Sequence, residues 1–245
     1  MRTRVSSLSG VVAVGRATLQ DVDFRRASFD HFRSEGATFV SCDFRGLQLE
    51  AKFQPFFSTR RQSVFRECRF DGADLRALDP GQSRFERCSF EAARIDGWHC
   101  TTAEFVDCGF AGAVARVRFY GRPWGPTAQH LHPPRSLNAF RGNDFSRAEL
   151  LDTTFVMGID IGSQRWPEGD AYVRLDRIHH RIARAHAQII RWKDLEERKD
   201  ALALLESLSV LYGQQREIFS PRGYPRTGVS AAVERRVWEI LARDT

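Results

Sequence analysis

The chain has 245 residues, and its ionisable side chains give a formal net charge of +6 at pH 7. For a chain with 28% charged residues, an excess this small favours an ordinary Arg-rich surface over a dedicated nucleic-acid surface. No run approaches eighteen apolar residues, so we expect no membrane-spanning segment. The five cysteines are an odd number, which favours buried free thiols and therefore a reducing, cytoplasmic location.

Bulky apolar residues recur every five positions in the first part of the chain, each with a small or apolar residue two places before it. Ser34 interrupts the series, which runs through Leu19, Phe24, Phe29, Phe39, Phe44 and Leu49. Residues 1–16 precede the repeat. We expect them to form an N-terminal cap, because a repeating rod needs a cover over its open end.

Residues 50–62 break this spacing. The segment reads EAKFQPFFSTRRQ and shifts the register by one, so we expect it to leave the repeat as a loop. Loops on a rigid frame often carry binding residues. Its aromatic and basic side chains are therefore candidate contacts for a partner: Phe53, Phe56, Phe57, Arg60 and Arg61. The alternative is that the three phenylalanines fold back onto the body of the protein.

A longer period of twenty follows between Ser63 and Ala115. The segments SVFRECRFDGADL, SRFERCSFEAARI and AEFVDCGFAGAVA align without a gap. The alignment places identical residues in four columns: Phe65, Phe85 and Phe105; Cys68, Cys88 and Cys108; Phe70, Phe90 and Phe110; Ala73, Ala93 and Ala113. We expect the cysteines to be buried as small apolar side chains.

A period of five fits neither regular structure. On an α-helix, five residues rotate the side chain by about 500°, so the rings would not share a face. On a straight strand, an odd period sends alternate rings to opposite faces. If the chain instead turns a corner every five residues, all the rings point inward and four sides complete one coil. We therefore predict a mainly β solenoid whose coils stack about 4.8 Å apart around a solid axis.

The five-residue pattern resembles the pentapeptide repeat family. The family's consensus is a small residue, Asp or Asn, Leu or Phe, a polar residue, and then Gly or another small residue. Ala73–Ala77 (ADLRA) and Asn143–Arg147 (NDFSR) carry the motif in this sequence. The resemblance covers residues 17–160. It implies a right-handed quadrilateral β-helix of about five coils, with loop excursions at 50–62 and 116–137, followed by a C-terminal α-helical region.

The second excursion, at 116–137, contains the sequence GRPWGPTAQHLHPPR. Its prolines predict a stiff loop lying across one face of the rod, with Trp124 as its anchor. His130 and His132 are two apart, but Zn²⁺ requires three or four ligands and no Cys or carboxylate is close in sequence. We therefore expect no metal and no other cofactor. Trp124, His130 and His132 are further candidate partner contacts.

The region 168–245 changes to helical spacing. One apolar stripe runs from Tyr172 to Trp192, and a second runs from Leu195 through Tyr212 to about Phe219. Ser230 is positioned to cap a third, shorter helix. We predict three helices, which either pack on the last coil or pair with a second copy of the chain to form a homodimer.

Arginines accompany the first helical stripe: Arg174, Arg177, Arg181 and Arg184. Such an array could bind the phosphates of a nucleic acid. We favour the alternative, a solvated face that pairs with acidic residues of a neighbouring helix.

No catalytic motif is present in the sequence, so we favour a non-enzymatic scaffold that presents loops and helices to a protein partner. The family resemblance implies an alternative, because some members protect DNA gyrase and topoisomerase IV from inhibitors and resemble a DNA duplex in shape and negative charge. This chain departs from those members in its positive charge and its long C-terminal region. Nucleic-acid binding through the arginines above is the second alternative.

Overall fold

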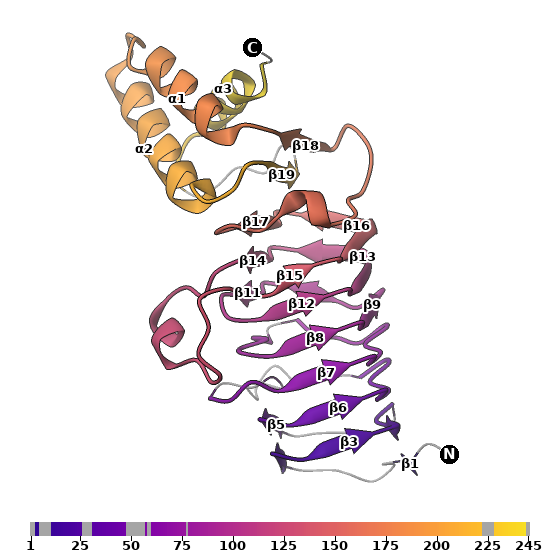
Figure 1. The fold of residues 1–245 in the computed structure, drawn as a ribbon. Coiled ribbons are helices and arrows are strands. Elements are labelled where there is room, and N and C mark those ends of the chain that lie inside the picture. Colours follow the sequence, from indigo (N-terminus) through magenta and orange to yellow (C-terminus); the bar gives the residue numbers. More distant parts are fainter. Residues whose placement is uncertain are drawn as a thin grey trace.

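The computed structural model of the chain describes residues 3–4, 11–25, 31–47, 57, 60–76, 78–221 and 228–243. Figure 1 shows two parts, a rod of stacked strands and a helical region at its C-terminal end. No helix of the described part is long and apolar enough to cross a bilayer.

The rod is made of short strands that pair in parallel with strands of the neighbouring coils (Figure 1). The longest sheet contains β3 (Thr18–Gln20), β6 (Thr38–Val40), β7 (Val64–Arg66), β8 (Arg84–Glu86), β12 (Glu104–Val106) and β15 (Phe140–Arg141). A second contains β9 (Ser89–Glu91), β10 (Ile95–Asp96), β13 (Gly109–Ala115) and β16 (Asp144–Leu151). A third contains β11 (His99–Cys100), β14 (Arg118–Tyr120) and β17 (Thr154–Val156).

The pairing confirms the period of twenty. Phe65 pairs with Phe85, and Phe85 pairs with Phe105, so equivalent residues of successive coils lie side by side. The chain turns from one sheet to the next through a backbone corner of positive φ, two residues after an inward ring. At the corners after the long sheet φ is 53° at Ser41, 54° at Glu67, 51° at Arg87 and 54° at Asp107. The five-residue spacing therefore arises because the chain turns a corner after each inward ring.

The phenylalanines fill the interior in two continuous ring stacks. In one, Phe39, Phe65, Phe85 and Phe105 stack with centroid separations of 4.7, 5.2 and 5.1 Å. In the other, Phe24, Phe44, Phe70, Phe90, Phe110 and Phe145 stack with separations from 4.5 to 5.1 Å. All these rings are buried. The predicted solid axis of aromatic side chains is therefore confirmed.

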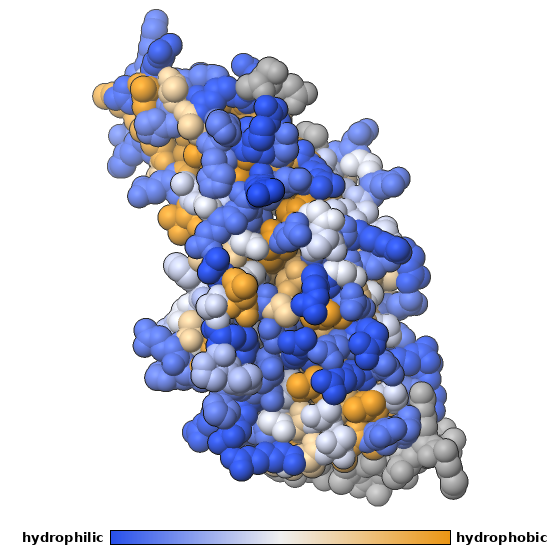
Figure 2. Space-filling model, viewed as in Figure 1, coloured by the Kyte–Doolittle hydropathy of each residue, from blue (hydrophilic) through white to orange (hydrophobic). Residues whose placement is uncertain are grey.

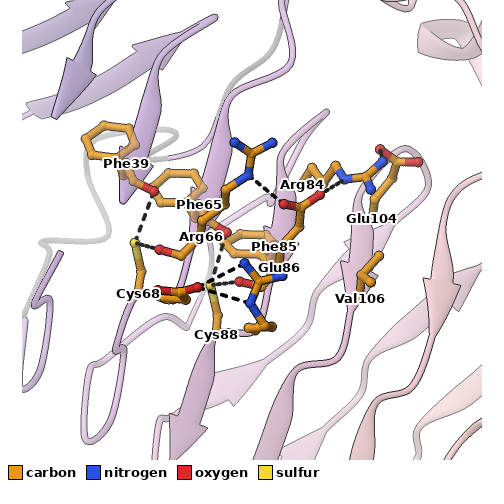
Figure 3. Close-up of polar contacts among 12 residues, drawn as sticks. Phe39, Phe65, Arg66, Cys68, Arg84, Phe85, Glu86, Cys88, Glu104 and Val106 are labelled. Carbon is orange, nitrogen blue, oxygen red and sulfur yellow. Dashed lines mark hydrogen bonds and ion pairs between the residues drawn. The ribbon is translucent and has the colours of Figure 1, made fainter. Parts of the chain in front are cut away.

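The predicted free, buried cysteines are also confirmed. Each thiol of the column donates to a backbone carbonyl of the preceding coil, as from Cys68 Sγ to Phe39 O (3.5 Å) and from Cys88 Sγ to Phe65 O (3.2 Å) (Figure 3). Burial raises the pKa of Cys88. Asn143 takes the column position after Cys108 and donates through Nδ2 to Phe105 O (3.0 Å), so an amide continues the same ladder.

The gapless alignment of three segments is wrong at its last positions. Ile95 pairs with Val114 instead of Ala115, and Ala113 is exposed instead of buried. Ala111 still pairs with Glu91, twenty positions earlier, but Val114 pairs with Ile95, nineteen positions earlier, so one residue is lost between Ala111 and Val114. The physical reason is that the interior position takes the larger apolar side chain, Val114, which is 2% exposed.

The described residues before position 17 belong to the stack. β1 (Thr3–Arg4) pairs in parallel with β4 (Val22–Asp23), and β2 (Val11–Gly15) pairs in parallel with β5 (His31–Glu35). The segment predicted to be a cap thus contributes strands that cover the coil containing β4 and β5.

The helical region contains the three predicted helices, α1 (Ile178–Ile189), α2 (Leu195–Tyr212) and α3 (Ala231–Ala242). Ser230 caps α3 by accepting a hydrogen bond from Val233 N, as predicted. The outer ends of the first two stripes were assigned wrongly. β18 (Tyr172–Leu175) and β19 (Ile218–Pro221) form an antiparallel pair in place of helix.

This strand pair explains how the rod ends. Trp166 stacks on Phe145 (5.4 Å), Phe219 stacks on Trp166 (4.4 Å), and Tyr172 stacks on Phe219 (5.4 Å). The aromatic column therefore continues out of the last coil into β18 and β19. Of the two expected arrangements, the structure shows the helical region packed on the last coil (Figure 1), and homodimer formation stays a prediction.

Candidate partner-binding surfaces

The second excursion is shorter than predicted and leaves the rod after β14. Arg118–Tyr120 remain in the coil, so the excursion spans Gly121 to Leu137 and is here called the 121–137 loop. It includes a 3-10 helix, Pro126–His130, and projects beside the rod near the level of β12 (Figure 1). Its last part runs back along earlier coils, where Gln62 N donates to His132 O (2.8 Å) and His132 N donates to Gln82 Oε1 (2.9 Å).

Buried polar groups fix the base of this loop. Asn138, which is 4% exposed, donates through Nδ2 to Thr101 O (3.1 Å) and Tyr120 O (2.9 Å). Arg135 donates through Nη2 to Thr102 O (2.5 Å), and burial lowers the pKa of its guanidinium. The buried Glu104 carboxylate accepts a hydrogen bond from Ala139 N (2.8 Å) where the chain re-enters the coil. A network of this kind holds the loop in one position.

The exposed part of the loop carries the side chains that a partner could reach. Trp124 is 47% exposed and Leu137 is 56% exposed, while His130 and His132 are exposed as well. Trp124 is therefore not the anchor that we predicted. Leu131, at 6% exposure, is the buried apolar side chain of this part of the loop, and its position between two exposed histidines gave no sequence signal of that burial.

The first excursion is only partly described. Phe53 and Phe56 lie outside the described residues. Phe57 was predicted to contact a partner, but it is fully buried and makes edge contacts with Phe65 (5.6 Å), Phe85 (5.1 Å) and Trp98 (5.9 Å). The physical reason is that an interior space between the ring stacks accepts a large apolar side chain from the excursion, which was the alternative left open.

Arg60 and Arg61 remain exposed, as a binding role requires. Their backbone N–H groups both donate to the Glu35 carboxylate, at 3.0 and 2.9 Å, so the segment is tied to the rod. Because the adjacent Gln62 bonds to His132, these two arginines lie next to the end of the 121–137 loop.

The arginines of the helical region do not form the phosphate-binding array considered above. Arg174 lies on β18 and pairs with Glu217 (2.5 Å). Arg177 precedes α1 in a left-handed conformation and pairs with Asp176 (3.1 Å). Both charges are thus engaged by acidic neighbours.

The other two predicted arginines stabilise the end of α3. Arg181 is 7% exposed and donates through Nη1 to Leu241 O (2.8 Å) and Arg243 O (3.1 Å). Arg184 donates through Nη2 to Ile240 O (3.2 Å) and Arg243 O (2.6 Å). The last carbonyls of a helix lack partners within the helix, and these guanidinium groups supply them. This structural role, reached across about sixty residues of sequence, engages Arg181 and Arg184 within the chain, and nucleic-acid binding by them stays a prediction.

The charges of the rod alternate in ladders. Arg66 and Arg84 both contact the Glu86 carboxylate at 2.6 Å, and Arg84 also approaches Glu104 at 3.5 Å (Figure 3). Burial raises the pKa of Glu86, but hydrogen bonds from Arg66 and Arg84 outweigh it and leave the pKa lowered. On the face drawn in Figure 2, small apolar patches lie among hydrophilic side chains. Interleaved positive and negative groups do not reproduce the uniform negative charge of a DNA duplex.

Among the described residues, no group of three His, Cys, Asp or Glu side chains could hold a metal ion.

Comparisons with known proteins returned a family match and a solved structure. The family model described as "Pentapeptide repeats (8 copies)" matches residues 17–51. A search of solved structures returned a trypsin-treated form of QnrB1, described as a plasmid-mediated fluoroquinolone resistance protein, with 13% identity and a TM-score of 0.26 over 68% of this chain and 80% of that chain. A search of curated proteins found no match.

Proposed function

This chain is a pentapeptide repeat protein, and from that premise we propose that it is a non-enzymatic scaffold that binds a protein partner through the 121–137 loop. The single observation that carries the proposal is Trp124, an aromatic side chain that is 47% exposed on a loop with a fixed base. A non-enzymatic role rests on the sequence, which has no catalytic motif.

A fixed loop with an exposed aromatic residue suits protein recognition for two reasons. Tryptophan is among the residues that contribute most to binding at interfaces. The loop is already ordered by Arg135 and Asn138, so binding requires little further loss of conformational freedom. The neighbouring basic side chains, Arg60 and Arg61, would extend the contact surface beyond the loop.

The proposal is tested by affinity capture from a cell lysate followed by binding measurements with the captured protein. Trp124→Ala should weaken the binding by about tenfold or more. Leu195→Ala is the matched control, because it removes an apolar side chain that is 64% exposed on the helical region. Both variants should unfold at the wild-type temperature. Equal binding by wild type and Trp124→Ala would contradict the proposal.

The second candidate function is interaction with DNA gyrase or topoisomerase IV. It is supported by the family resemblance and by the departure of the 121–137 loop from the rod, since resistance-conferring members of the family carry such loops. The alternating charges of the rod argue against duplex mimicry as the mode of contact. Purified protein should change gyrase supercoiling or protect it from a quinolone, and Trp124→Ala should lose this effect. No change at micromolar protein would eliminate this candidate.

A further inference from the structure

A groove of about 870 Å³ lies between the last coils of the rod and α2. The side chains of the third sheet form one wall, and α2 forms the other through Ala203, Leu204 and Val210. Sites for small molecules commonly occupy such clefts between two structural units, and this volume falls within their usual range of about 300 to 1,000 Å³. The groove is separate from the 121–137 loop and shares no residue with it.

The rod wall presents a column of hydrogen-bond donors. His99 pairs with Arg118, and Arg118 pairs with Thr154, as outward neighbours on adjacent parallel strands. The three side chains therefore follow one another at the strand spacing of about 4.8 Å. An imidazole, a guanidinium and a hydroxyl in one line can donate hydrogen bonds to a negatively charged group.

Two of these groups lack a partner within the described chain. Thr154 is 7% exposed, and its hydroxyl oxygen is buried without a hydrogen bond. A buried polar group in this condition is uncommon and calls for an explanation. Arg118 is half-buried and forms no ion pair with any described residue. Arg116, two positions before it, pairs with Asp96 (2.5 Å).

The rest of the lining decides what kind of anion would fit. Buried Leu204, with half-buried Leu211 and Val229, gives the groove an apolar interior. The carboxylates of Asp152 and Glu206 lie at its exposed rim and would repel a second negative charge. A ligand with a single anionic group and an apolar body meets both conditions.

We propose that this groove binds a small amphipathic carboxylate, with its anionic group on Arg118 and Thr154 and its apolar body against Leu204, Leu211 and Val229. Arg118 supplies the charge-assisted hydrogen bond, which is the stronger kind. The Thr154 hydroxyl forms a hydrogen bond only when the ligand is present. This inference is independent of the partner proposed for the 121–137 loop.

Octanoate, octan-1-ol and octylammonium are the probes, because they share a chain length and differ in the charge of the head group. Calorimetry with the full chain should show saturable binding of octanoate and none of the alcohol or the cation. Methyl NMR spectra should show shifts at Val117, Leu204, Val210 and Val229. Equal binding of octanoate and octan-1-ol, or shifts centred on Ile182 and Leu202 between α1 and α2, would overturn the proposal.

Substitutions separate the site from general surface binding. Arg118→Met should weaken octanoate binding by about tenfold, the effect of one hydrogen bond to a charged group. Thr154→Val is nearly isosteric and should also weaken it, while leaving the protein at least as stable, since an unpaired hydroxyl is removed. Arg94→Met, which removes one charge on another face of the rod, is the control. Wild-type affinity in a folded Arg118→Met or Thr154→Val protein would overturn the assignment.

Discussion

The rod and the helical region are stabilised by contacts of different kinds. In the rod each contact recurs in the next coil, as when Cys68 and Cys88 each bond to a carbonyl of the coil before. In the helical region each contact occurs once, as between Arg181 and the carbonyl of Leu241. The difference teaches that the role of a rod residue follows from its column, whereas the role of a helical-region residue depends on one distant partner.

The two regions should therefore respond differently to substitution. A rod distributes its stability over interfaces between neighbouring coils, so a central residue supports two interfaces at once. In the helical region α3 packs against both α1 and α2, and α1 completes its C-terminal end through a few side chains. Losing one of them should loosen that helix without disturbing the rod.

The largest effect is expected from Phe90→Ala in the centre of the rod. Phe90 stacks between Phe70 (5.1 Å) and Phe110 (5.0 Å) and is 1% exposed. Truncation should lower the free energy of unfolding by about 4 kcal/mol, because it removes a buried ring and leaves a cavity. Phe90→Leu, the matched control, should cost about 1.5 kcal/mol or less. Chemical denaturation measures both, and a similar loss for both variants would show that the ring stack is not the source of stability.

A smaller and local effect is expected from Arg181→Met. The substitution leaves the carbonyls of Leu241 and Arg243 without this donor, and it should cost about 3 kcal/mol. Hydrogen exchange should accelerate in α3 and remain unchanged in the strands of the rod. The exposed Arg191 of the same region provides the control as Arg191→Met, which should have little effect. Faster exchange throughout the rod would break the comparison between the two regions.

The smallest effect concerns pH. The Asp43 side chain in the rod is fully buried and accepts hydrogen bonds from Arg45 at 2.9 and 2.8 Å. Burial raises the pKa of Asp43, but Arg45 and Arg25 outweigh it, so the pKa is lowered in the folded protein. The stability from this charge is therefore complete above the unfolded pKa of about 4 and is lost as the pH falls through the lower folded value.

Denaturation curves recorded between neutral pH and strongly acidic pH test this prediction. Asp43→Asn should show a shallower decline of stability in acid than the wild type. Asp176→Asn is the counterpart in the helical region, and it should change the acid dependence less, because the Asp176 side chain is 53% exposed. Identical acid profiles for wild type and Asp43→Asn would remove the role assigned to this carboxylate.

Much of the rod could be predicted because its pattern is local. Phe65, Phe85 and Phe105 lie in one column for the same reason that they align in sequence, and the corners at Glu67 and Arg87 repeat with them. The shift that exchanges Ala115 for Val114 could not be predicted, since a one-residue irregularity can occur at several places along a strand.

The candidate surfaces were predicted less well. His130, His132, Arg60 and Arg61 are exposed, and their contact with a partner stays a prediction, whereas Phe57 is interior and Trp124 is not an anchor. Composition alone cannot separate an aromatic residue that fills a space in the core from one that faces solvent, because both lie in segments outside the repeat.

The sequence by itself determined the repeating unit, the inward rings and the change to helices after the rod, since each depends on residues a few positions apart. Only the tertiary structure decided that Tyr172 and Phe219 join across β18 and β19 to extend the aromatic column, and that Arg181 completes the end of α3. The physical reason is that these contacts join residues more than forty positions apart and occur once, so no periodic pattern in the sequence predicts them.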